Sequence, residues 1–317
     1  MVGIIENRAV TRCFAAAAMA ALFAAGFAGG AEAQQKRLTL TGSIGFEYDD
    51  NVTTDEIDST SNLSDMALLI ELGGAYKPKF GGAYGLELGY DFSQSLHEDL
   101  DDFDLQTHTL SASVEREVSS WDLGLIYLYS RTFLGGDDFL GIHSATPSVG
   151  RSVTDRWYVS LRYGFQAKNF IQDANDARDA VNNGLTIDNF IFFDQSRSYI
   201  SLGYRIEDEN TDGDQFDYIG HFLHARAKLR VPIKRIQRWN PVLRLGFEFS
   251  KKDYSSITPS IGAERDDERV TLSAALTAAI TKYENIELAV EHIEADSNLA
   301  SADYEETIVI FRVGGKY

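Results

Sequence analysis

One pattern recurs from about residue 38 to the end of the sequence: a run of about ten residues in which apolar and polar side chains alternate, closed by a polar or turn-forming cluster. In one run, Leu86, Leu88 and Tyr90 alternate with Glu87 and Gly89. A period of two places the apolar side chains on one face of a β-strand and the polar side chains on the other. Fourteen runs follow the pattern, at about 38–48, 63–76, 83–96, 103–117, 121–133, 142–153, 157–170, 185–195, 198–208, 217–231, 241–252, 266–280, 286–296 and 304–317.

The length of these runs distinguishes a membrane barrel from a soluble β-sandwich. Strands of soluble proteins usually have about 5–6 residues, whereas a tilted strand needs about 9–11 residues to cross a bilayer. Aromatic residues gather near the run ends, as in the girdles of outer-membrane barrels; they are Tyr76, Trp121, Trp157, Trp239 and Tyr317 near one end and Tyr48, Phe92, Tyr129 and Phe249 near the other. Unpaired backbone groups are too costly in lipid, so the sheet must close on itself. The sequence therefore predicts an all-β fold, a closed antiparallel transmembrane β-barrel of about 14 strands, with 12 or 16 as alternatives.

The connections between runs alternate in length and charge. Those after even-numbered runs are mostly short and carry basic residues such as Lys77, Arg156 and Arg197, whereas those after odd-numbered runs are often longer and acidic. Outer-membrane barrels have short periplasmic turns and longer outer loops. This predicts the outer membrane of a Gram-negative bacterium, with both termini periplasmic and with outer-membrane lipid and lipopolysaccharide as surroundings. The last run ends on Tyr317 and resembles the C-terminal signal read by the barrel assembly machinery, which is an expected partner.

The first residues have the parts of a secretory signal peptide. Arg8 and Arg12 precede the apolar run 14–30, and the small-residue site 31–33 follows it. We expect residues 1–33 to be the signal peptide and residues 34–317 the barrel. Cys13 is the only cysteine, so the mature chain is expected to have no disulfide and no thiol nucleophile. The net charge of −19 argues against nucleic-acid binding, which needs a basic surface.

If the apolar faces meet lipid, the alternate faces line the lumen. The charged residues expected there are Glu47, Glu71, Glu87, Asp91, Arg162, Arg205, His224, Arg226, Lys228, Arg230, Arg244, Glu248, Glu287, Glu291 and Arg312. One wall would be acidic and the facing wall basic, an arrangement that orients polar solutes and filters them by charge. The alternative is that these side chains form ion pairs that fill the barrel. The stripe from His224 to Arg230 is the least ordinary feature, because it places three cations and an imidazole on one strand face, suited to anionic sugars or phosphates.

Two other kinds of site were considered. Ser201 and His224 could meet on neighbouring strands, but no catalytic or nucleotide-binding motif accompanies them, so we expect neither enzyme activity nor a cofactor. The acidic segment after the first run is a candidate cation-binding rim, formed by Asp49, Asp50, Asn51, Asp55, Glu56 and Asp58. Its spacing matches no EF-hand, and a solvated acidic rim without a metal is the favoured interpretation.

Four stretches carry a family resemblance: YDDNV at 48–52, YRIEDENTDGDQFDYIG at 204–220, ERDDERVTLSAAL at 264–276 and DSNLASADYEE at 296–306. Together they resemble the C-terminal fourteen-stranded barrel of the surface lipoprotein assembly modifier family and related proteobacterial barrels. In that family the barrel follows periplasmic tetratricopeptide repeats and helps to place lipoproteins on the cell surface. No such repeats lie between the expected cleavage site and the first run, so the resemblance implies that a periplasmic repeat partner would be a separate chain.

The expected function is therefore a porin-like channel or export conduit for polar or charged solutes. The first alternative is a translocon component for surface lipoproteins or exopolysaccharide that works with a periplasmic partner. The second alternative is a barrel lipase.

Overall fold

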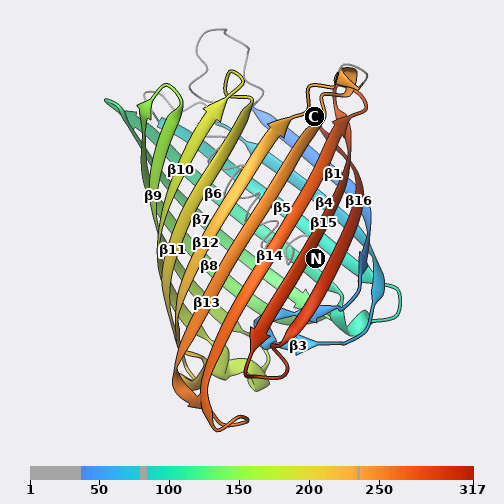
Figure 1. Cartoon of the computed structure of the whole chain (residues 1–317), viewed down its shortest axis with the longest axis vertical. Helices are drawn as coiled ribbons and strands as arrows, with labels where there is room; N and C mark the ends of the chain where they lie inside the picture. The colour runs from blue at the N-terminus through green and yellow to red at the C-terminus, as the bar shows by residue number, and fades with distance from the viewer. Residues whose placement is uncertain (1–36, 79–83, 234–235) are drawn as a thin grey trace.

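The computed structural model describes residues 37–78, 84–233 and 236–317, and within them fourteen long antiparallel strands close into one barrel (Figure 1). The predicted strand number and closure are therefore confirmed. The expected signal peptide, residues 1–33, lies outside the described residues. The barrel strands are β1 (Leu38–Asp49), β4 (Asp65–Tyr76), β5 (Tyr84–His97), β6 (Leu105–Val118), β7 (Trp121–Leu134), β8 (Asp137–Thr154), β9 (Trp157–Phe170), β10 (Ala180–Phe193), β11 (Ser198–Thr211), β12 (Tyr218–Arg230), β13 (Val242–Thr258), β14 (Ala263–Ala279), β15 (Glu284–Ser297) and β16 (Tyr304–Lys316).

The first and last strands close the barrel. β1 pairs with β16 from Thr41↔Lys316 to Asp49↔Ile308 and with β4 from Leu38↔Tyr76 to Asp49↔Asp65. Every other barrel strand pairs with its neighbours in sequence order, so the sheet has no free edge. A sheet without an edge can satisfy its backbone hydrogen bonds in lipid. The end at which β1 begins and β16 ends is called the terminal end below, and the opposite end is called the loop end.

Five strands extend by three or more residues beyond the predicted runs. β8 begins at Asp137, β10 at Ala180 and β14 at Ala263, whereas β11 continues to Thr211 and β13 to Thr258. The apolar alternation weakens before these strands end, because polar residues such as Asp253 of β13 occupy outward positions in their outer parts. Ladder hydrogen bonds continue there without an apolar face, and this explains why hydrophobic periodicity predicted the strands too short.

The two faces of the barrel differ in polarity as expected. Large apolar side chains are exposed on the outside, among them Leu72, Leu110, Leu125, Leu202, Leu223 and Leu288. Inward-facing positions are mostly polar or charged, but a small apolar cluster at the loop end includes Leu69, Leu105, Ile308 and Ile310. The alternation predicts charged residues in the lumen, and it does not predict this apolar cluster.

Short elements cap the loop end. Between β1 and β4 lie the two-stranded sheet of β2 (Thr53–Thr54) and β3 (Ser59–Thr60) and the 3₁₀ helix η1 (Asp55–Ile57). Further 3₁₀ helices are η2 (Asp101–Phe103), η3 (Asp173–Arg178), η4 (Asp214–Phe216) and, at the terminal end, η5 (Gln237–Trp239). No helix in the described part of the chain is long and apolar enough to cross a membrane.

Candidate functional site

The candidate site is the barrel lumen, and the strand registers place all fifteen predicted charged residues on its side of the sheet. Residues that pair directly across strands share a face. Glu248 pairs with His224, Arg244 with Lys228 and Glu287 with Arg312, while the outward neighbours of these residues are apolar. Among the fifteen, Glu47, His224 and Glu291 are buried. The period-two pattern thus gives the direction of each side chain, whereas the contacts each one makes depend on its neighbours in the closed barrel.

Ion pairs neutralise much of the basic wall formed by β9 to β12. Arg162 Nη2 lies 2.6 Å from Asp188 Oδ2, and His224 Nε2 lies 2.7 Å from Asp188 Oδ1. On the same wall Arg205 pairs with Glu207 at 2.7 Å. A further pair joins Lys168 and Glu209 at 2.6 Å. The alternation did not predict these three carboxylates as lumen residues, although Glu207 and Glu209 share strand parity with the predicted lumen residue Arg205.

A second network joins strands on both sides of the barrel closure. Arg312 lies 3.1 Å from Glu71 and 3.3 Å from Glu287, and Arg244 lies 2.9 Å from Glu287. Basic and acidic side chains therefore alternate locally on this side of the lumen. The expected picture of one acidic wall facing one basic wall needs correction, because carboxylates occur on the basic side and Arg312 lies among the acids.

Three cations of β12 stand apart from these networks. Arg226, Lys228 and Arg230 form no ion pair with any described residue, and the buried Nε of Arg226 has no hydrogen-bond partner among them. Arg226 and Glu248 line the lumen cavity. Because Arg226, Lys228 and Arg230 are two residues apart on one strand, their side chains project from the same face.

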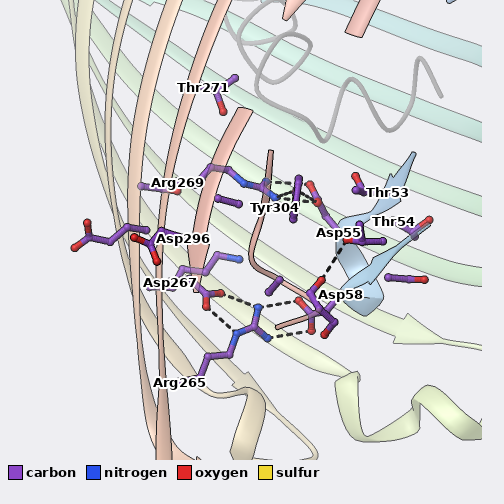
Figure 2. A pocket seen from close by; sticks show the side chains of 18 of the residues that line it. Thr53, Thr54, Asp55, Asp58, Arg265, Asp267, Arg269, Thr271, Asp296 and Tyr304 are labelled. Atoms are coloured by element: carbon purple, nitrogen blue, oxygen red, sulfur yellow. Dashed lines mark hydrogen bonds and ion pairs between the residues drawn. The ribbon is translucent and has the colours of Figure 1, made fainter. Parts of the chain in front are cut away.

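The acidic segment between β1 and β4 folds into the mouth of the barrel. We call residues 50–64 the lumen loop. Figure 2 shows two of its aspartates facing arginines of β14. Arg265 donates from Nη1 and Nη2 to the two carboxylate oxygens of Asp58 at 3.0 and 2.8 Å, and Arg269 contacts Asp55 in the same bidentate way at 3.0 and 2.9 Å. These two contacts are called the loop ion pairs below. Charge-assisted bidentate pairs are among the strongest polar contacts in proteins.

Other groups position the loop ion pairs. The Tyr304 hydroxyl donates to Asp55 Oδ1 at 2.7 Å. Arg178, at the end of η3, donates to Asp58 Oδ2 at 2.7 Å, and its guanidinium lies 4.1 Å from the ring centroid of Phe216 in η4. Residues from three connections thus meet at the loop end and hold the lumen loop in place.

An apolar contact supplements these polar contacts. Val52, the third residue of the lumen loop, is fully buried and packs with Leu69, Leu105, Ile308 and Ile310 in the inward-facing cluster. Backbone hydrogen bonds from Val52 N to Leu63 O at 3.0 Å and from Ser61 N to Val52 O at 2.9 Å join the two ends of the loop. The loop is therefore held both by a buried apolar side chain and by ion pairs.

The placement of Asp55 and Asp58 differs from the expected solvated rim. Both carboxylates lie inside the mouth of the barrel and contact guanidinium groups, because the loop is long enough to fold inward and β14 presents Arg265 and Arg269 to it. Asp49, Asp50 and Asn51 bond to backbone groups of the loop or of β16. Glu56 offers its backbone carbonyl to Arg178 at 3.2 Å. Within the described ranges, no group of three or more acidic or histidine side chains is arranged to hold a metal ion.

The charge state of Asp58 follows from these neighbours. Burial by itself would raise its pKa, but the hydrogen bonds and positive charge of Arg265, with the charge of Arg178, outweigh burial and lower the pKa below its ordinary value of 3.8. Asp58 is therefore ionised at neutral pH, and the ion pair with Arg265 is fully formed there.

A cavity of about 480 Å³ lies in the lumen beside the lumen loop. Its lining combines Asp55, Glu56 and Asp58 of the loop with polar side chains of β6 to β14, which include Thr109, Ser130, Gln166, Arg205 and Arg226. A cavity of this volume, lined in large part by charged and hydroxyl-bearing side chains, can admit small hydrated solutes. A smaller cavity of about 90 Å³, most of whose lining is drawn in Figure 2, lies between the lumen loop, β13 and β14.

The candidate Ser–His pair does not have the geometry of a catalytic pair. Ser201 is cross-strand from Arg226, and His224 from Gly203. His224 directs Nε2 to Asp188, while the buried hydroxyl of Ser201 has no hydrogen-bond partner among the described residues. A serine nucleophile requires a hydrogen bond to its general base.

No protein-family model matches the chain, and no curated protein matches it. Among solved structures, the chain is similar to OmpT, an outer membrane protein of Vibrio cholerae, with 9% identity over 90% of this chain and 100% of that chain and a TM-score of 0.50. A loop L8 deletion mutant of OmpT matches with 10% identity over 88% and 99% of the two chains, also with a TM-score of 0.50. OccAB3 of Acinetobacter baumannii matches with 9% identity, the same coverages and a TM-score of 0.48. At these identities the comparison shows the fold alone, that of outer-membrane β-barrels.

The comparisons leave the narrower resemblance to the surface lipoprotein assembly modifier family as a prediction. They do not address the substrate, the orientation of the termini or the partners. The geometry of the lumen is therefore the basis for a function.

Proposed function

We propose that the chain forms a passive channel for small polar solutes in the outer membrane of a Gram-negative bacterium, with the lumen loop narrowing its mouth. The observation that carries the proposal is the cavity of about 480 Å³, lined by charged, polar and apolar side chains, inside a closed barrel whose outer surface is apolar. An enzyme would need a positioned catalytic group, and a purely structural barrel would be expected to fill its lumen with side chains.

The lumen favours anions over cations of similar size. Arg226, Lys228 and Arg230 have no carboxylate partner among the described residues, whereas Arg162, Lys168 and Arg205 of the same wall are paired. An anion that passes the lumen loop therefore meets three positive charges on one strand face. Phosphate, sulfate or carboxylate groups fit this chemistry, because ammonium and guanidinium groups bind them by charge-assisted hydrogen bonds.

Liposome swelling tests the channel. Purified protein would be reconstituted into liposomes and exposed to iso-osmotic neutral sugars of increasing size. We expect swelling with monosaccharides that falls as the sugar grows, since the lumen loop restricts the mouth. Protein heated to unfold the barrel provides the control.

A barrel that stays closed to every sugar would contradict the proposal. Closed liposomes that open on addition of a periplasmic repeat protein would favour a translocon for surface lipoproteins or exopolysaccharide. Hydrolysis of the liposome lipid, lost in Ser201→Ala, would favour a barrel lipase.

A further inference from the structure

The outward-facing charges differ between the two ends of the barrel. At the loop end they are paired with acids: Arg131 lies 2.9 Å from Asp138, and Lys251 lies 3.3 Å from Asp266 and 3.1 Å from Glu268. At the terminal end, outward cations lie against aromatic rings. This difference concerns the surface that meets lipid and is independent of the lumen.

Two cation–aromatic pairs occupy four consecutive strands at the terminal end. The Arg116 guanidinium of β6 lies 4.7 Å from the ring centroid of Tyr84 in β5, and it donates to the Tyr84 hydroxyl at 2.6 Å. The Arg151 guanidinium of β8 lies 4.8 Å from the Trp121 ring of β7. Neither arginine forms an ion pair with a described carboxylate, and both are exposed. We call these four residues the arginine–aromatic patch.

The patch lies at the border between the apolar belt and water. Leu123 and Leu125 come after Trp121 on the same outward face of β7 and are 42% and 48% exposed. Tyr84 and Trp121 are 49% and 43% exposed. Aromatic rings at this depth occupy the headgroup level of a bilayer. The register pairs Arg116 with Leu123, so each arginine lies beside the apolar surface on which acyl chains would rest.

The same end carries further cations without a described acidic partner. Arg238 of η5 lies 4.6 Å from the Trp239 ring, and Lys282, in the turn between β14 and β15, lies 5.1 Å from the Tyr283 ring. The terminal end therefore carries cations beside aromatic rings at three places around the barrel: on β5 to β8, at η5 and in the turn between β14 and β15. A lipid headgroup that carries an ammonium group would place that positive charge beside these cations, which is unfavourable. A headgroup whose only charge is its phosphate avoids this repulsion.

From these observations we infer that the arginine–aromatic patch binds the headgroup phosphate of an anionic phospholipid, with the acyl chains on Leu123 and Leu125. The free guanidinium N–H groups of Arg116 and Arg151 donate to phosphate oxygens, and the rings of Tyr84 and Trp121 keep the guanidinium planes at the headgroup level. The inference does not depend on the barrel being a channel.

Native mass spectrometry of the full barrel tests it. The purified protein would be incubated in detergent with equal amounts of phosphatidylglycerol and phosphatidylcholine, and the bound lipids would be counted. We expect the wild type to retain phosphatidylglycerol preferentially. Arg116→Gln with Arg151→Gln should lower this preference by about fivefold for each arginine, the effect of removing one basic residue near an anionic lipid surface.

Arg131→Gln is the matched control, because Arg131 also faces outward but Asp138 already neutralises it; this variant should keep the wild-type preference. Each single variant, Arg116→Gln and Arg151→Gln, should show an intermediate loss, which keeps the test valid if the double variant does not fold. Equal binding of both lipids by the wild type, or an unchanged preference in the double variant, would overturn the inference. The inference would also be overturned if the double variant lost binding of added lipid A but still bound phosphatidylglycerol, because the patch would then bind lipid A and not a phospholipid.

Discussion

Gly203 allows two strands that are not neighbours to touch inside the barrel. β11 separates β10 from β12, yet His224 Nε2 lies 2.7 Å from Asp188 Oδ1. Both residues pair with Gly203 in the register, one from each side. A side chain at position 203 would project between them. Glycine is therefore required because the side chains of His224 and Asp188 meet over this position, and not because of its backbone conformation.

Gly203→Ala should destabilise the barrel. The added methyl group would overlap His224 Nε2 and Asp188 Oδ1 and would separate a buried hydrogen bond. We expect a loss of about 1–3 kcal/mol in the free energy of unfolding, as for overpacking of a filled interior. Urea unfolding in lipid vesicles, followed by tryptophan fluorescence, measures it. Gly164→Ala is the control, since the nearest atom to a methyl there is a backbone oxygen 4.0 Å away; equal stability of the two variants would contradict this account.

Asp58 gives the lumen loop a predictable response to acid. The pKa of Asp58 is lower when the lumen loop lies in the barrel mouth than when it is released. Its carboxylate therefore stabilises the bound loop fully at pH values above its ordinary pKa of 3.8, and this stabilisation is lost as the pH falls through the lowered pKa. The contribution of Asp58 to docking should therefore be constant from about pH 7 to pH 4 and should disappear at more acidic pH.

Planar-bilayer conductance at different pH values tests this response. Wild-type conductance should be steady down to about pH 4 and rise below it as the loop is released. Asp58→Asn should already have the higher conductance at pH 7 and show a smaller rise. Asp303→Asn, an exposed acid in the connection between β15 and β16, serves as the control and should behave as wild type. A wild-type conductance for Asp58→Asn at pH 7 would show that the loop does not depend on this carboxylate.

At the scale of the element, β12 and the lumen loop make different contributions to the lumen. The inward face of β12 ends in Arg226, Lys228 and Arg230, which have no carboxylate partners among the described residues, whereas the lumen loop uses its acids to bind Arg265 and Arg269. The acids of the lumen loop neutralise the arginines of β14, whereas the cations of β12 stay available to a solute. The difference arises because the loop reaches β14 and not the part of β12 that carries these cations.

Reversing charge on β12 should change ion selectivity. Arg226→Glu with Lys228→Glu replaces two lumen cations by anions, so the ratio of anion to cation permeability should fall by about tenfold, in line with a change of roughly 1.4 kcal/mol in the barrier for an anion. Reversal potentials in asymmetric KCl measure the ratio. Lys251→Glu with Lys282→Glu makes the same change in net charge outside the lumen, and an equal shift in that variant would assign the effect to surface charge.

At the scale of the whole molecule, the position of the connections predicts how the barrel lies in the membrane. Both ends of the barrel chain, the turn at 119–120 and the turn at 155–156 are at the terminal end, whereas the lumen loop and the connections with η2, η3 and η4 are at the loop end. Longer connections of outer-membrane barrels face the outside of the cell. We therefore expect the terminal end to face the periplasm.

Cysteine labelling in cells tests the orientation, because the chain has a single cysteine, Cys13, in the expected signal peptide. Ser260→Cys, in the connection between β13 and β14, should react with a membrane-impermeant maleimide on intact cells. Ser120→Cys, in the turn between β6 and β7, should react only after the outer membrane is permeabilised. The reverse pattern would invert the barrel and place the lumen loop on the periplasmic side.

Much of the fold could be predicted because its cause is local. Alternation along each strand depends only on neighbouring residues, so it correctly predicted the number of strands and the side of the sheet on which residues such as Glu248 and Arg312 lie. Strand ends were less predictable, since β13 and β14 continue beyond the apolar pattern. The contacts of the lumen were the least predictable, because Asp188 meets Arg162 of β9 and His224 of β12 through the register of neighbouring strands, which the alternation along one strand does not give.

The sequence by itself determined a closed barrel with an apolar exterior and a charged interior, since a period of two together with the cost of unpaired backbone groups in lipid leaves no other arrangement. Only the tertiary structure decided which interior charges are neutralised and where the acidic loop lies. Asp58 and Arg265, which form one of the bidentate ion pairs, are 207 residues apart in the sequence. No local pattern encodes such a pair; it arises because closure brings β14 beside the loop, and burial makes an ion pair there more favourable than separate charges.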